Sequence, residues 1–143
     1  VPFRLFEMEI TEHIAMHDLQ LANEKLQHLR DLGINIALDD FGTGYSSLNY
    51  LKRLDVNKLK IDKSFIDGIE NDPQDQKLVD SIITIARNFE LDVVVEGVED
   101  AAQYDWLAQY TDLLYQGYYL NKPLSVADFL QEMQAISTQK ATG

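Results

Sequence analysis

The sequence predicts an α/β fold in which short parallel strands alternate with amphipathic helices. Two observations support this class. Short runs rich in Val, Ile and Leu recur along the 143 residues, and the segments between them repeat apolar residues at helical spacing. The runs are apolar almost throughout, as expected for parallel strands covered by helices. The predicted strands are Phe3–Glu9, Ile34–Asp39, Lys58–Asp62, Asp92–Glu96 and Leu113–Gln116.

The helix after the first strand is defined by its apolar face and by both of its ends. Asp18 is placed to cap its start and Gly33 to end it. Its apolar face comprises Leu19, Ala22, Leu26, Leu29 and Leu32. A second predicted helix, later in the chain, has an apolar face of Leu78, Ile82, Ile85, Ala86 and Phe89. The caps expected for the other helices are Ser46 or Ser47, Asp100 and Ser125.

Five βα units in this length have the spacing of a (βα)8 barrel, whose eight strands typically take ~250 residues. We therefore expect residues 1–136 to form the C-terminal part of such a barrel, without roughly its first three strands, and residues 137–143 to form a disordered tail. An open doubly wound sheet has the same periodicity and remains an alternative. The sequence begins at Val1 rather than Met, so we expect it to be cut from a longer protein.

Composition excludes several classes of function. The formal net charge is −12, which argues against binding of a nucleic-acid polymer because a polyanion would be repelled. No apolar run approaches the roughly 18 to 20 residues of a membrane span, and no secretory signal is present. These features predict a cytoplasmic domain without direct membrane contact. The chain has no cysteine, so oxygen or imidazole ligands would have to hold any metal.

Each predicted strand ends in a polar or charged residue that its apolar body does not explain. Because the carboxyl ends of parallel strands meet at one rim, these side chains should share a crevice. Adjacent carboxylates such as Asp39 and Asp40 repel each other unless cations lie beside them, which indicates a two-metal site. The residues at the strand ends are Glu9, Asp39 with Asp40, Lys60 with Asp62, Glu96, and Gln116.

Glu96 is a candidate metal ligand or general base, and Glu99 follows it after a glycine turn. A lysine such as Lys60 inside a barrel would be costly unless it served carboxylates or a reacting water. Two further patterns are better explained by ordinary structure. We interpret His13 and His17 as surface histidines, and we interpret the tyrosines around Gln116 as packing residues.

Taken together, these motifs closely resemble the EAL-domain phosphodiesterases. The resemblance covers nearly the whole chain up to about Met133. It implies a modified triosephosphate-isomerase-type barrel that hydrolyses cyclic di-GMP to linear pGpG with Mg²⁺ or Mn²⁺. The motifs that carry it are Glu9-Ile-Thr-Glu12, the run from Asp39 to Leu48 (DDFGTGYSSL), Lys60-Ile-Asp62, Glu96-Gly-Val-Glu99 and Gln116-Gly-Tyr118 with Pro123.

The resemblance also implies roles for these residues. Glu9 and Asp39 would bind the first metal, Asp39 would bridge to the second, and Asp40 would complete it. Glu96, also a metal ligand, and Lys60 would hold and activate the attacking water. The supporting residues would be Gln116 at the rim, Glu12 holding the loop after Asp40, and Asp62 and Glu99 as partners of Lys60 and the ligands. That loop would mediate a homodimer, and sensory or GGDEF domains would precede the domain in the parent protein.

The glutamate of the EAL signature, an asparagine ligand and a substrate-binding arginine belong to a region that this chain does not contain. We therefore expect an incomplete active site and an isolated fragment that is inactive. One alternative is a degenerate EAL domain that binds cyclic di-GMP or a partner as a sensor. A more distant alternative is an enolising barrel enzyme, because strand-end carboxylates and the pair Lys58 and Lys60 also suit proton abstraction.

Overall fold

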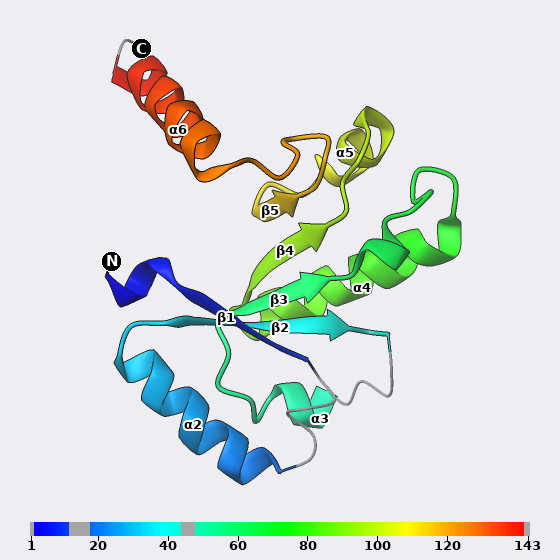
Figure 1. Ribbon diagram of the computed structural model, residues 1–143. Helices are drawn as coiled ribbons and strands as arrows, with labels where there is room; N and C mark the ends of the chain where they lie inside the picture. Colours follow the sequence, from blue (N-terminus) through cyan, green and yellow to red (C-terminus); the bar gives the residue numbers. More distant parts are fainter. Residues whose placement is uncertain (1, 12–17, 44–47, 142–143) are drawn as a thin grey trace.

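The computed structural model describes residues 2–11, 18–43 and 48–141 (Figure 1). Its strands form one parallel sheet in sequence order, from β1 through β2, β3 and β4 to β5. The strands are β1 (Glu7–Thr11), β2 (Asn35–Phe41), β3 (Lys58–Ile61), β4 (Asp92–Glu96) and β5 (Leu113–Gln116). The helices are α2 (Leu19–Asp31), α3 (Leu48–Leu51), α4 (Pro73–Asn88), α5 (Ala101–Leu107) and α6 (Val126–Ala141), with 3₁₀ turns η1 (Phe3–Leu5) and η2 (Lys63–Phe65).

The register divides the sheet into an apolar face and a polar face, because successive side chains on a strand point to opposite sides. On the apolar face, residues such as Leu38, Leu59 and Val95 are fully buried and belong to the same core as Val79 and Ile83 of α4. Figure 1 shows α4 lying behind this part of the sheet. The polar face carries alternate residues of the same strands, among them Glu7, Glu9, Asp39, Lys58, Lys60, Glu96 and Gln116.

The strands β4 and β5 have the bounds that the sequence predicts, whereas β1 and β2 differ, and β3 ends at Ile61 because Asp62 caps η2. Residues 3–5, expected to open the first strand, form η1, closed by a hydrogen bond from the Leu5 N–H to the Pro2 carbonyl. Pairing with β2 begins at Glu7 and continues to Thr11, so Glu9 lies within β1 rather than at its end. The strand β2 continues past Asp39 to Phe41.

The predicted helix ends are confirmed wherever the structure describes them. The Asp18 carboxylate accepts a hydrogen bond from the Leu21 N–H at 3.0 Å, and Asp100 forms a capping box with Gln103. The Ser125 hydroxyl accepts one from the Asp128 N–H. Ser46 and Ser47 lie outside the described residues.

Two predictions about helices are corrected. The buried face of α4 is Val79, Ile82, Ile83 and Ala86, while Leu78 is exposed; its packing stripe is therefore rotated from the predicted one. The helix α6 covers residues 137–141, which were expected to be a disordered tail. Gln139, Lys140 and Ala141 in that segment have high helix propensity.

None of the described helices is both long and apolar enough to cross a membrane.

Candidate active site

A bulge in β2 places two carboxylates opposite one lysine. Leu38 is aligned with Leu59, but Phe41 is aligned with Ile61, so Asp39 and Asp40 together face the single residue Lys60. An extra residue of this kind bends the strand and redirects its side chains. Asp40 takes a left-handed conformation with φ of +57°, and its N–H donates to the Asp39 carboxylate at 3.0 Å.

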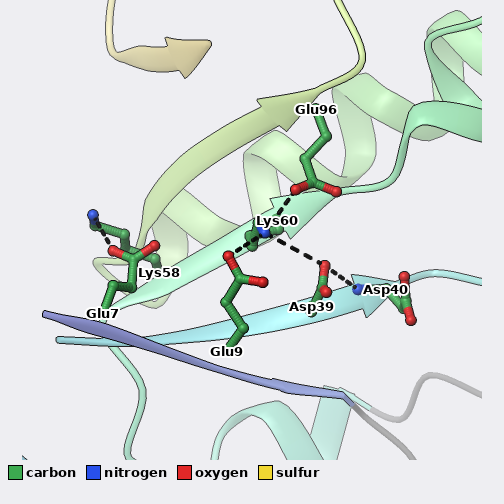
Figure 2. Close-up of polar contacts among 7 residues, drawn as sticks. All are labelled: Glu7, Glu9, Asp39, Asp40, Lys58, Lys60 and Glu96. Atoms are coloured by element: carbon green, nitrogen blue, oxygen red, sulfur yellow. Dashed lines mark hydrogen bonds and ion pairs between the residues drawn. The ribbon is translucent and has the colours of Figure 1, made fainter. Parts of the chain in front are cut away.

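Lys60 lies at the centre of the site and is 3% exposed. Its Nζ donates to Glu9 Oε1 at 2.5 Å, lies 2.6 Å from Glu96 Oε1, and is 4.0 Å from Asp39 Oδ1. Figure 2 shows these carboxylates reaching the ammonium group from three different strands. A buried ammonium is stable only with such partners, because removing the charge from water is costly.

The pKa values of the site reflect this crowding. Burial alone lowers the pKa of the Lys60 ammonium, but the hydrogen bonds to Glu9 and Glu96 outweigh it and the pKa lies above its ordinary value. Burial and the charges of Asp39 and Asp62 raise the pKa of the Asp40 carboxyl, while Lys60 opposes them. Lys60 is therefore a permanent cation at neutral pH, and Asp40 binds its proton more tightly than an exposed aspartate does.

Other predicted residues lie farther around the rim. Asp62 caps η2 by accepting a hydrogen bond from the Ser64 N–H at 2.9 Å. Hydrogen bonds from the Ser64 side chain and backbone lower the pKa of the Asp62 carboxyl. Glu99 pairs with Lys63 at 2.5 Å rather than with Lys60. Beyond the ends of β4 and β5 is an open groove of about 510 Å³, lined by Lys63, Glu96, Glu99, Gln116, Tyr118 and Lys122 among others. Glu12, His13 and His17 lie outside the described residues.

The site carries side chains of the type that bind hard divalent cations, but in this structure they surround a lysine. Glu9, Asp39, Asp40 and Glu96 offer carboxylate oxygens, the ligands that Mg²⁺ and Mn²⁺ prefer. Within residues 2–11, 18–43 and 48–141, no three acidic or histidine side chains are arranged to share one metal ion. Lys60 supplies the charge that offsets Glu9 and Glu96.

The sequence predicted the strands that carry Glu9, Asp39, Lys60, Glu96 and Gln116, but not how these side chains pair. It did not foresee the bulge at Asp39 and Asp40, nor the second ion pair between Lys58 and Glu7 at 2.5 Å. The signal for this pair was present, since Glu7 and Glu9 alternate on one strand as Lys58 and Lys60 do on another.

Comparisons with known proteins agree with the motifs and the fold. The EAL domain family model matches residues 1–123. Cyclic di-GMP phosphodiesterase NbdA of Pseudomonas aeruginosa is 40% identical over 129 residues, which are 90% of this chain and 16% of NbdA. The bifunctional diguanylate cyclase/cyclic di-GMP phosphodiesterase MucR of the same organism is 41% identical over 123 residues, 86% of this chain and 18% of MucR.

Solved structures extend the likeness to three dimensions. The structure of the PaMucR phosphodiesterase in complex with c-di-GMP has a TM-score of 0.83 and 38% identity, covering 90% of this chain and 52% of that one. A manganese/cy-diGMP complex of Klebsiella pneumoniae BlrP1 has a TM-score of 0.75 and 30% identity, covering 82% of this chain and 30% of that one. The solved relatives include EAL domains, so the five-stranded sheet corresponds to part of a TIM-type barrel. The chain belongs to the EAL domain family.

Proposed function

We propose that this chain is part of a phosphodiesterase that hydrolyses cyclic di-GMP to linear pGpG. The observation that carries the proposal is the group of carboxylates from β1, β2 and β4, including the bulged pair Asp39 and Asp40, around the buried Lys60 of β3. The names of NbdA and MucR, each at least 40% identical to this chain, support the substrate and the reaction.

We propose further that the site uses Mg²⁺ or Mn²⁺, held by Glu9, Asp39, Asp40 and Glu96. The support is the set of oxygen donors and the manganese/cy-diGMP complex of BlrP1. When bound, such cations polarise a phosphate oxygen and lower the pKa of a bound water.

The residues of the chain have separate tasks in this proposal. Lys60 has a raised pKa, so it acts as a fixed cation that orients Glu9 and Glu96 and offsets negative charge at the phosphate. Glu96 is the general base that accepts a proton from the attacking water. Gln116 lines the adjacent groove and contacts the nucleotide.

The test is turnover of cyclic di-GMP with Mn²⁺ by a protein in which this chain is joined to the rest of its domain. We expect Asp39→Asn and Glu96→Gln each to reduce kcat at least about 100-fold. Asp112→Asn is the matched control, since Asp112 pairs with Arg87 away from the site and its loss should leave kcat within about threefold. Undiminished cleavage by both site variants would refute the assignment, and binding without cleavage by the wild type would favour a sensor.

We also propose that the 143-residue chain by itself turns over cyclic di-GMP poorly. Its sheet, as far as the structure describes it, is open with β1 and β5 at the edges, and unpaired edges leave a barrel site exposed to water. The loop after Asp40 as a dimer contact, and sensory or GGDEF domains as neighbours, are further proposals. MucR, a bifunctional diguanylate cyclase/cyclic di-GMP phosphodiesterase, supports the second.

A further inference from the structure

A second lysine and glutamate pair lies on the same face of the sheet as the Lys60 site, two residues earlier on the same two strands. Lys58 Nζ is 2.5 Å from Glu7 Oε2, and both side chains are partly buried. Figure 2 shows the two pairs next to each other, with Lys58 directed at Glu7 and Lys60 directed at Glu9. Both pairs join β3 to β1 and so pass over the strand between them, β2.

The register places three carboxylates near Lys58 on this face of the sheet: Glu7 and Glu9 on β1, and Asp92, which is aligned with Lys58 on β4. Glu9 and Lys58 are both aligned with Ala37 of β2, so Lys58 is level with Glu9 rather than with Glu7. Ala37 has a side chain of one carbon, which leaves the space above it open to the longer side chains. Lys58 nevertheless donates to Glu7, and Glu9 accepts its hydrogen bond from Lys60 at 2.5 Å.

We propose that Glu7 is a positioning residue that keeps Lys58 away from Glu9. A partly buried ammonium needs an anionic partner. Once Glu7 is neutral, the carboxylates level with Lys58 are Glu9, across β2, and Asp92 on β4. We propose that Lys58 turns to Glu9; a move to Asp92 would leave Lys60 unchanged. Glu9 would then be shared between two lysines, its bond to Lys60 would weaken, and its affinity for a divalent cation would fall. The last step rests on the proposed function, whereas the exchange of partners does not.

This role predicts a pattern that an ordinary ion pair would not give. A pair that serves stability alone loses its contribution when either partner is removed, and removing the second partner restores nothing. Here Glu7→Gln should disturb Lys60, Lys58→Met should not, and the double variant should return to the wild-type behaviour because the competing ammonium is gone.

The first measurement needs neither metal nor nucleotide. In the 143-residue chain with isotope-labelled lysine, NMR follows proton exchange of the Lys60 ammonium. We expect faster exchange in Glu7→Gln, wild-type exchange in Lys58→Met and in the control Asp112→Asn, and recovery in Glu7→Gln/Lys58→Met. Unchanged exchange in Glu7→Gln, or a change that Lys58→Met does not reverse, would overturn the proposal.

The second measurement is Mn²⁺ binding, read from the EPR signal of the free ion, in a protein with the complete domain. We expect Glu7→Gln to weaken binding about 10-fold and the double variant to recover most of it, as for other residues that orient a ligand. Absence of Mn²⁺ binding in the wild type would refute the proposed metal site, and the exchange measurement would still decide the role of Glu7. Wild-type Mn²⁺ affinity in Glu7→Gln would overturn the proposal that Glu7 supports metal binding by Glu9.

Discussion

Asp40 combines two energetic costs that its place in the site explains. Its φ of +57° puts a residue other than glycine in the left-handed region. Burial and the charges of Asp39 and Asp62 also raise the pKa of its carboxyl. A raised pKa in the folded state means that stability is lost as the pH rises through this pKa and the group ionises. At neutral pH the metal-free chain therefore tolerates a charge that opposes folding.

We expect Asp40→Asn to stabilise the metal-free chain at pH 7 by about 0.5–1 kcal/mol. Asparagine removes the charge and is well accepted in the left-handed region. Urea unfolding in the presence of a chelator measures the effect, which should shrink near pH 3 because wild-type Asp40 is then protonated.

The control for Asp40→Asn is an aspartate whose pKa is shifted in the opposite direction. Arg87 lowers the pKa of the Asp112 carboxyl, so this carboxylate contributes stability above its unfolded-state pKa. Asp112→Asn should therefore destabilise the chain at pH 7, and this loss should disappear as the pH falls. A destabilised Asp40→Asn variant at pH 7 would contradict the electrostatic explanation.

At the scale of single residues, the sequence could predict which side chains share a face but not which of them pair. Alternation alone brings Glu9, Lys60 and Glu96 to one side of the sheet. The contact of Lys60 with Glu9 depends on side chains crossing β2, and the bulge after Leu38 in β2 brings two further carboxylates opposite Lys60. Neither feature has a local pattern in the sequence, because both arise from the packing of three strands.

Two helices end in the same way but with different residues at the left-handed position. After α2, Gly33 has φ of +89°, and the N–H groups of Gly33 and Ile34 donate to Arg30 and Leu29. After α4, Glu90 has φ of +58°, and the N–H groups of Glu90 and Leu91 donate to carbonyls of the last turn. Both ends are Schellman motifs, in which glycine is favoured.

We expect Glu90→Gly to raise the free energy of unfolding by about 1 kcal/mol, because glycine avoids the steric cost of the left-handed conformation. Gly33→Ala is the matched reverse change and should lower it by a similar amount. Urea denaturation followed by circular dichroism gives both values. A fall in stability for Glu90→Gly would mean that Glu90 makes a contribution larger than the strain of its backbone.

Among the elements, prediction succeeded where the pattern was local and failed where it depended on neighbouring strands. The continuous Val93-Val94-Val95 run and its flanks gave the bounds of β4 correctly. The start of β1 was wrong because Phe3 and Leu5 are apolar yet have no partner on β2, whose pairing begins at Asn35 opposite Glu7. An apolar run therefore identified a strand but could not locate its first paired residue.

At the scale of the molecule, the core lies between β2, β3, β4 and α4, and α6 stands apart from it (Figure 1). Every described side chain from Tyr118 to Ile136 is exposed, including apolar ones such as Phe129 and Met133. Stabilisation by burial scales with the apolar area removed from water. The helix α6 should therefore contribute little to the stability of this chain.

We expect a chain that ends at residue 125 to unfold as cooperatively as the 143-residue chain, with a free energy lower by less than about 1 kcal/mol. Ile83→Ala, a change in the fully packed interior, should by contrast cost about 2–5 kcal/mol. Urea denaturation of the three proteins under the same conditions makes the comparison. A loss on truncation as large as that of Ile83→Ala would show that α6 packs against the sheet in solution, and the apolar side chains of α6 would then belong to the core rather than to an exposed surface.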